Sequence, residues 1–263
     1  MLAIIGGSGL TRLSTLAVAH REVMRTPYGE PSSALVFGQI AGRNVAFLAR
    51  HGHGHTIPPH RVNYRANLWA LKQRGVDAIL AVASVGAISA QCAPGDLVLP
   101  HQLIDYTHGR QQTFFDGSDR EVVHVDFTEP YSAELRKRCL DAARAAGIEL
   151  RDAGVYGAVS GPRLETAAEI DRMERDGATL VGMTGMPEAA LARELDIAYA
   201  SIAVVVNHAA GRGDSAKGVS MERIARVLEK AIAKVKILID HVVQQYPAPR
   251  DPRQETDRRQ ETK

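Results

Sequence analysis

Cysteine is scarce in this sequence, which contains only Cys92 and Cys139 among its 263 residues. The two cysteines lie far apart, and the residues around them do not have the spacing of metal ligands. This pattern excludes a disulfide scaffold and a zinc ribbon, and it is typical of a protein from a reducing compartment. We therefore expect both thiols to lie in the core.

An excess of charge of one sign is also lacking. Lysine and arginine number 32 against 30 aspartates and glutamates, and the formal net charge of +2 is spread along the chain. Such a balance provides no electrostatic surface for nucleic acid. Long apolar runs are absent as well, since residues 78–90 and 197–206 fall short of the roughly 20 residues that a membrane helix needs. We expect partners that include neither nucleic acid nor a membrane.

The N-terminal apolar run stops at Gly6 and is too short for a signal peptide, so we expect a cytoplasmic protein. The composition is that of a folded chain, 45% hydrophobic and 24% charged. Because no Gly-, Ser- or Pro-rich linker interrupts residues 1–246, we predict one domain over this range. Beyond Tyr246, three prolines precede a polar stretch in which Arg-Gln-Glu-Thr occurs twice, which predicts a disordered tail over residues 247–263.

Short apolar runs of strand length alternate with segments of helical composition. The runs are residues 2–5, 34–40, 45–49, 78–83, 97–99, 155–160, 179–182 and 197–206. The helical segments are residues 63–74, 132–146, 166–176, 187–195 and a final helix after Ser220, its predicted N-cap. Three of the helices end near Gly75, Gly147 or Gly177. The alternation predicts an α/β fold with a mixed, mostly parallel central sheet flanked by helices.

A glycine-rich turn, Ile-Ile-Gly-Gly-Ser-Gly-Leu at residues 4–10, follows the first predicted strand. Its backbone N–H groups and the Ser8 hydroxyl are suited to binding an anion, but glycines also occur in ordinary turns. The turn lacks the full dinucleotide fingerprint, because Arg12 stands where that motif needs glycine or alanine.

A histidine-rich segment, Arg-His-Gly-His-Gly-His, occupies residues 50–55. Strand spacing would put its three histidines on one side, so one interpretation is a metal site. No known zinc signature or acidic ligand accompanies the histidines, however. A phosphate site that uses the fork of Arg50 is better motivated, because guanidinium geometry matches phosphate oxygens. A solvated loop is the third interpretation.

Further candidates follow other predicted strands. Small residues at 83–87 suit either a ligand crevice or close packing. Residues 160–166, 182–188 and 206–211 each follow a strand, so we expect them to converge on one crevice. Glu165 is either a charge at a helix N-terminus or a ligand, and Thr184 is either a helix cap or a ligand. Asn207 ends an apolar strand, where a buried amide needs hydrogen-bond partners.

Together these motifs resemble the trimeric purine nucleoside phosphorylases and, more closely, their methylthioadenosine phosphorylase branch. The similarity covers roughly residues 1–244, in motifs at residues 5–10, 50–59, 62–67, 94–96, 161–166 and 182–188. It implies cleavage of a purine nucleoside by inorganic phosphate, which gives free base and a ribose 1-phosphate. It further implies a homotrimer and no cofactor or metal, with phosphate as a co-substrate.

The resemblance implies roles for individual residues by motif position. The phosphate ligands are Ser8, Arg50, His51, Thr184 and, through its backbone, Ser84. Gly86 and Leu164 stand around the base, and Met183 stands beneath the ribose. His124 matches the residue that contacts the 5′ substituent of the nucleoside, from a loop that reaches a neighbouring subunit. Leu164 replaces a phenylalanine that usually stacks on the base.

Two departures from the branch concern the base. Methylthioadenosine phosphorylases have aspartates where Asn207 and Ala209 stand, and a serine where Glu165 stands. An ionised Glu165 only accepts hydrogen bonds, so it pairs with the N1–H of hypoxanthine and repels N1 of adenine. Asn207 offers a donor for O6 and an acceptor for N7–H as the base leaves. We therefore predict a 6-oxopurine site, with Asn207, Glu165 and His51 as the catalytic residues.

On the 5′ side, inosine and guanosine phosphorylases have a histidine where this chain has Met221. Met221 and Ile224 would form an apolar wall that favours a methylthio group over a hydroxyl, unless both are ordinary core residues of the last helix. The combination predicts phosphorolysis of S-methyl-5′-thioinosine. The alternatives are a methylthioadenosine phosphorylase, an inosine or guanosine phosphorylase, and a non-catalytic nucleoside- or metal-binding module.

Overall fold

A mixed sheet forms the centre of the protein. The computed structural model describes residues 1–117 and 121–247, so residues 248–263 of the predicted tail lie outside the described part. The strands are β1 Leu2–Gly6, β2 Ala17–Glu22, β3 Leu35–Ile40, β4 Arg43–Ala49, β5 Ala78–Ala87, β6 Leu97–Val98, β7 Gln102–Asp105, β8 Val155–Ala158, β9 Leu180–Gly182 and β10 Ala198–His208. The helices are α1 Tyr64–Gln73, α2 Ala133–Ala145, α3 Ala167–Arg175, α4 Gly185–Glu194 and α5 Met221–Gln245, with single 3₁₀ turns at Pro59–Arg61 and Gly213–Ser215.

The order of the strands brings four carboxyl ends to one edge of the sheet. The order is β2-β3-β4-β1-β5-β9-β8-β7, and β10 lies beside β5. Strand β1 runs parallel to β4 and β5, and β5 runs parallel to β10. The pairs β2–β3, β3–β4, β5–β9 and β6–β10 are antiparallel. This confirms the predicted α/β fold with a mixed sheet, and ligands of such sheets bind at the carboxyl edge.

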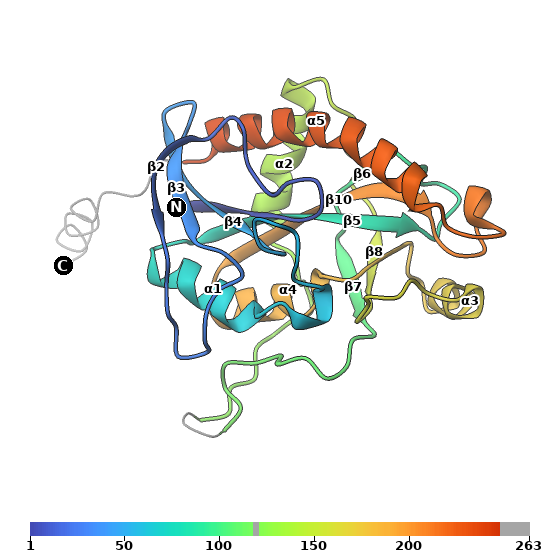
Figure 1. Ribbon diagram of the computed structural model, residues 1–263, viewed down its shortest axis with the longest axis horizontal. Coiled ribbons are helices and arrows are strands. Elements are labelled where there is room, and N and C mark those ends of the chain that lie inside the picture. The colour runs from blue at the N-terminus through green and yellow to red at the C-terminus, as the bar shows by residue number, and fades with distance from the viewer. Residues whose placement is uncertain (118–120, 248–263) are drawn as a thin grey trace, which may run out of the picture.

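Helices cover both faces of the sheet (Figure 1). On one face α1 and α4 pack against side chains such as Ala81, Ala83 and Val85 of β5. On the other face α2 and α5 pack against the alternate side chains, including Leu80 and Val82. Burial on both faces explains why the central strands are continuous apolar runs in the sequence. Helix α3 lies at the end of the sheet, over a smaller apolar cluster.

Local signals set the helix ends, as predicted for Ser220 and for three glycines. The side chains of Ser132, Thr166 and Ser220 each accept a backbone N–H three residues on, which caps α2, α3 and α5. Gly75, Gly147 and Gly177 follow α1, α2 and α3 with positive φ angles of 71°, 65° and 96°. These left-handed conformations favour glycine, so the predicted stops are confirmed.

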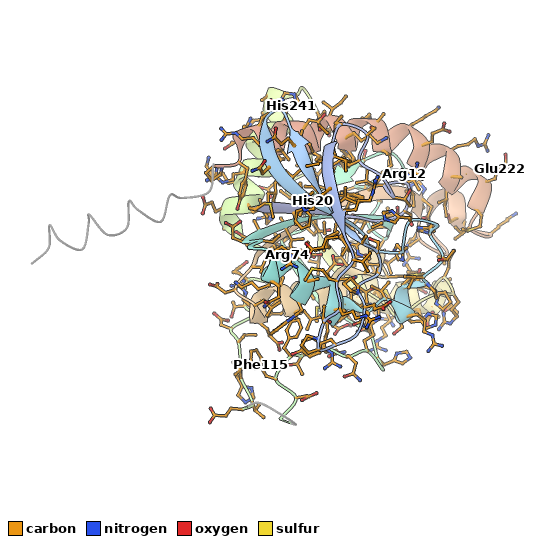
Figure 2. All side chains as sticks on the ribbon, turned by 60° about the vertical axis from the view of Figure 1, so that its left-hand side comes forward. Arg12, His20, Arg74, Phe115, Glu222 and His241 are labelled. Carbon is orange, nitrogen blue, oxygen red and sulfur yellow. The ribbon has the colours of Figure 1, made fainter. Side chains whose placement is uncertain are left out.

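Strands β2 and β7 were not among the strands predicted from the sequence. Strand β2, which carries the labelled His20 in Figure 2, forms the edge of the sheet and is almost wholly exposed. The His20 ring stacks on the Phe37 ring of β3, with 4.8 Å between the ring centroids. Strand β7 is the opposite edge and has four residues. Because edge strands with exposed faces need no apolar run, hydrophobicity did not reveal them.

The described residues between β7 and α2, 106–117 and 121–132, leave the sheet and extend away from it (Figure 1). None of the described helices is long and apolar enough to cross a membrane. Both cysteines are free. Cys139 is buried as predicted, whereas Cys92 is only half-buried because it lies in the turn after β5.

Candidate active site

A cavity of about 370 Å³ opens at the carboxyl edge of the central strands. It is lined by the glycine turn after β1, the loop after β4, the last residues of β5 and β10, the loops after β8 and β9, and the start of α5. The predicted site residues that line it are Ser8, Arg50, His51, Ser84, Gly86, Leu164, Glu165, Met183, Thr184, Asn207, Met221 and Ile224. Segments far apart in the sequence thus converge on one crevice.

The glycine turn after β1 lets Arg50 approach the strand ends. A Cβ at Gly7 would lie 2.5 Å from the carbonyl oxygen of Val82 and 3.0 Å from Nη1 of Arg50, so no side chain fits there. The backbone N–H of Arg50 donates to the Gly6 carbonyl over 3.0 Å. Glycine is therefore needed here for close packing, and the Ser8 side chain is left on the cavity wall.

Arg50 is buried in an ion pair that was not predicted from the sequence. Its Nε and Nη2 donate to the two carboxylate oxygens of Glu188 over 2.7 Å each, and Nη1 donates to Val82. The fork predicted to hold phosphate is thus occupied by Glu188. Burial alone lowers the pKa of Arg50, but the charge and hydrogen bonds of Glu188 raise it by more. Arg50 stays a cation and offers the cavity only its remaining N–H groups.

The ion pair is held by a third buried group. The Tyr199 hydroxyl donates to Glu188 over 2.8 Å, and burial raises the pKa of Tyr199. Glu188 lies in the first turn of α4, within the motif at residues 182–188, but nothing in its local spacing indicated a partner 138 residues away. Only the packing of α4 against the sheet brings the two charges together.

Glu188→Gln should lower the free energy of unfolding by about 1–3 kcal/mol, because a neutral amide leaves part of the buried guanidinium unpaired. Urea unfolding measures the change as a shift of the midpoint, provided that the dependence of the unfolding free energy on urea concentration is the same in both proteins. The matched control is Glu169→Gln, which alters the exposed pair between Arg163 and Glu169 and should move the midpoint little. Equal midpoint shifts in the two variants would contradict this account.

The histidine-rich segment folds into turns and not into a strand. His51 is buried and lines the cavity, His55 lines its mouth, and His53 points to solvent. Nδ1 of His51 donates to the Ile57 carbonyl over 2.8 Å, which leaves Nε2 as an acceptor in the neutral ring. Burial, with the nearby charge of Arg50, lowers the pKa of His51 to about 4, so the ring is neutral at pH 7. Among the described residues, no group of three or more His, Cys, Asp or Glu side chains has metal-binding geometry.

Thr184 is buried at the start of α4, but its hydroxyl does not cap the helix. Its backbone N–H donates to the Tyr156 hydroxyl over 3.4 Å, and its side chain lines the cavity. The interpretation of Thr184 as a simple helix cap is therefore wrong. Near the end of β5, the hydroxyl of Ser84 is buried without a hydrogen-bond partner among the described residues. Both hydroxyls stand on the same cavity as Arg50 and Ser8.

Asn207 reaches the cavity through an irregularity in β10. The pairing of β10 with β5 shifts register between Val205 and Asn207, so Asn207 stands opposite Gly86. Such a bulge redirects a side chain. The Asn207 amide nitrogen donates to the His208 carbonyl over 2.6 Å, which orients the group. Gly86 forms the wall beside this amide, since a Cβ there would lie 3.4 Å from the amide nitrogen, at ordinary van der Waals contact.

Glu165 lies across the cavity from these strands, just before α3. The neighbouring guanidinium of Arg163 is not available to it, because both of its forked nitrogens donate to Glu169 over 2.7 and 2.8 Å. Burial raises the pKa of Glu165, and the charge of Glu169 adds to the effect. Thr166, and not Glu165, makes the capping contacts of α3. In the described part of the chain, Glu165 therefore lines the cavity without an ion pair to another side chain.

The start of α5 forms the other end of the cavity. Met221 is 67% exposed, and it lines the cavity together with the half-buried Ile224 and with Ile57. Met221 is thus not a core residue of the last helix, although Ile224 packs partly on the core. This end of the cavity is apolar.

The structure does not bring two predicted residues to the cavity. Ala209 is 1% exposed and packs in the apolar cluster beneath α3, because the bulge that turns Asn207 inward leaves Ala209 behind the wall formed by Gly86. His124 is exposed in the segment that extends away from the sheet, and it does not line the cavity of its own chain.

Comparisons with known proteins agree with this geometry. The model of the phosphorylase superfamily matches residues 1–244. A probable S-methyl-5′-thioinosine phosphorylase of Pseudomonas syringae pv. tomato is 54% identical over 241 residues, which are 92% of this chain and 97% of that protein. The 6-oxopurine nucleoside phosphorylase of Pyrococcus furiosus is 44% identical over 90% of each chain. The methylthioadenosine phosphorylase of Schistosoma mansoni, solved with adenine, superposes with a TM-score of 0.89 at 32% identity, over 92% of this chain and 90% of that one.

Proposed function

The chain belongs to the phosphorylase superfamily, and on that premise we propose that it cleaves S-methyl-5′-thioinosine with inorganic phosphate to hypoxanthine and 5-methylthioribose 1-phosphate. The protein is a purine nucleoside phosphorylase, a pentosyltransferase. The observation that carries the proposal is the meeting of Glu165 and Asn207 with the apolar wall of Met221 in one cavity. The first pair selects the base, and the wall selects the 5′ group.

The base end supports a 6-oxopurine. In hypoxanthine, N1 carries a proton and O6 accepts hydrogen bonds, so the Glu165 carboxylate receives N1–H and the Asn207 amide donates to O6. Oδ1 of Asn207 then accepts N7–H. This last bond gains strength as the base departs, because the purine acquires negative charge and takes up a proton at N7.

The phosphate end supports attack on C1′ without a covalent enzyme intermediate. A phosphate oxygen forms a bond to C1′ while the bond from C1′ to N9 breaks, and its electron pair moves onto the purine. The net proton on the released base comes from hydrogen phosphate. Arg50 supplies a permanent positive charge, Ser8 and Thr184 supply hydroxyls, and Nε2 of the neutral His51 suits the protonated oxygen of phosphate.

Met221→His should shift the preference at the 5′ position. A histidine offers a hydrogen bond to a 5′-hydroxyl and removes apolar contact with a methylthio group, so the ratio of kcat/KM for methylthioinosine over inosine should fall at least about tenfold. Steady-state assays of both nucleosides at saturating phosphate measure this ratio. Met221→Leu keeps the apolar wall and should leave the ratio within about threefold of wild type. A ratio that Met221→His leaves unchanged would rule out this wall as the determinant.

The decisive experiment compares methylthioinosine, methylthioadenosine and inosine, with and without phosphate, by release of free base. Hypoxanthine release mainly from methylthioinosine, and only with phosphate, supports both ends of the site. Preference for methylthioadenosine would mean that Glu165 does not select a 6-oxopurine. Preference for inosine would mean that Met221 does not select the methylthio group. No release from any nucleoside would refute the proposed function and favour a binding module.

We further propose a cytoplasmic homotrimer that needs no cofactor. The two free cysteines support a reducing location. The segment that carries His124 also exposes Val122 and Val123, at 62% and 44%, which supports contact of this segment with another subunit. In such a trimer His124 would approach the 5′ group of the neighbouring site. Size-exclusion chromatography with light scattering tests the assembly, and a monomeric active enzyme would contradict it.

A further inference from the structure

Two of the loops that line the cavity carry predicted contacts to all three parts of the substrates: the base, the ribose and the phosphate. Leu164 and Glu165 belong to the loop after β8, and Met183 and Thr184 belong to the loop after β9. The loops touch tightly, because a Cβ at Gly161 would lie 2.4 Å from Sδ of Met183. Their relative position therefore sets the distance between the base end and the phosphate end of the site.

Arg110 holds these two loops together, although it does not line the cavity. Its Nη2 donates to the carbonyls of Ser160 and Met183 over 2.8 Å each, and Nη1 donates to the carbonyl of Met186. One guanidinium thus bonds backbone from both loops. Arg110 lies in the segment that leaves β7, far in sequence from either loop.

A third part of the cavity wall is tied to the same guanidinium. The guanidinium of Arg110 lies over the Tyr64 ring, 5.3 Å from its centroid. The Tyr64 hydroxyl donates to the carbonyl of Pro59 over 3.1 Å, and Pro59 lines the cavity at the end of the histidine-rich segment. Arg110 and Tyr64 therefore connect three substrate-facing segments.

The chemistry of arginine explains why one side chain does this. Several carbonyl oxygens converge on the guanidinium, and their dipoles repel one another unless a cation lies between them. A planar fork with five N–H groups reaches carbonyls in several directions at fixed geometry, whereas an ammonium is a single point charge. Among the described residues, the hydrogen bonds of Arg110 run to carbonyls and to Tyr64, and not to a carboxylate.

We propose that Arg110 is a positioning residue for the reaction, which holds the loop of Leu164 and Glu165 in register with the loop of Met183 and Thr184. This rests on the proposed function, since it concerns the alignment of nucleoside and phosphate in the same cavity. An error of about 1 Å in such alignment costs on the order of 10²-fold in rate. The loss of rate should appear in the chemical step, which needs the nucleoside and the phosphate in alignment at the same time.

The test is Arg110→Lys, with Arg136→Lys as the matched control. Arg136 is a half-buried arginine that also donates to two backbone carbonyls, those of Leu99 and Pro100, but it lies on α2 away from the cavity. Arg110→Lys should lower kcat about 10²-fold while each KM changes by less than about fivefold, since the ligands of each end remain. Arg136→Lys should keep the wild-type kcat, and urea unfolding should find both variants folded.

A kcat for Arg110→Lys equal to that of Arg136→Lys would overturn the proposal, as would a loss confined to the KM of one substrate. If the lysine variant does not fold, Tyr64→Phe tests the same network. Removing that hydroxyl frees Pro59 and should lower kcat about tenfold at unchanged KM, and a wild-type kcat would overturn the proposal. Wild-type enzyme that cleaves none of the three nucleosides refutes the proposed function itself, which separates the two failures.

Discussion

Methylthioinosine should be cleaved about 10⁴-fold more efficiently than methylthioadenosine at pH 8, in kcat/KM, and Glu165→Gln should remove most of that preference. The ionised carboxylate of Glu165 has only lone pairs to offer, and N1 of adenine also presents a lone pair. A buried mismatch of this kind leaves two acceptors facing each other without a proton. Glutamine offers a donor and an acceptor from the same position, so it can serve either base.

The preference for methylthioinosine over methylthioadenosine should weaken as the pH is lowered. Burial raises the pKa of Glu165 above its ordinary value, and Glu169 adds to this, while Arg163 opposes it only weakly because Glu169 holds its fork. Above that pKa the carboxylate rejects adenine. As the pH falls toward the pKa, the protonated fraction rises by up to about tenfold per pH unit, and the protonated carboxyl donates to N1 of adenine.

The experiment measures kcat/KM for both nucleosides from pH 8 to pH 5, in wild type and in Glu165→Gln. The ratio of kcat/KM for methylthioinosine over methylthioadenosine should fall as the pH is lowered in the wild type. It should stay constant in the variant, whose amide does not titrate in this range. Because both substrates share the phosphate and His51, other titrations cancel in the ratio. A ratio that is constant with pH in the wild type, or a variant that still rejects adenine 10⁴-fold, would remove Glu165 from base selection.

Asn207→Ala should lower kcat for methylthioinosine by about 10²–10³-fold, with the KM for phosphate within about threefold of wild type. The amide acts on charge that appears on the purine only as the bond to C1′ breaks, so its loss affects the transition state more than binding. The bulge at Val205 and the bond to the His208 carbonyl hold the amide ready in the free enzyme. Pre-orientation of this kind avoids reorganisation during the reaction.

The matched control is Ser201→Ala, which removes a buried polar side chain elsewhere on β10, at a point that does not line the cavity. Its kcat should remain close to wild type. Single-turnover measurements separate the chemical step from product release. A loss in phosphate affinity comparable to the loss in kcat would argue that Asn207 supports the fold of the site and not the departing base.

Much of the fold was predictable because its determinants are local. A strand buried on both faces must be an apolar run, as β1, β5 and β10 are. A helix that begins at Ser220 needs an oxygen to accept an orphan N–H, and a chain that turns at Gly147 needs a residue tolerant of positive φ. The edge strand β2 escaped prediction because neither of its faces is buried.

The sequence by itself determined which residues stand at the ends of the central strands, because strand length and turn chemistry depend on neighbours a few residues away. Only the tertiary structure decided what those residues do to one another. It pairs the guanidinium of Arg50 with Glu188, directs Asn207 into the cavity and packs Ala209 in the apolar cluster beneath α3. It also placed Arg110 between two loops that follow it by about fifty and seventy residues. Such pairings follow from the packing of distant segments and from the cost of leaving buried charges and carbonyls unpaired, which no local pattern records.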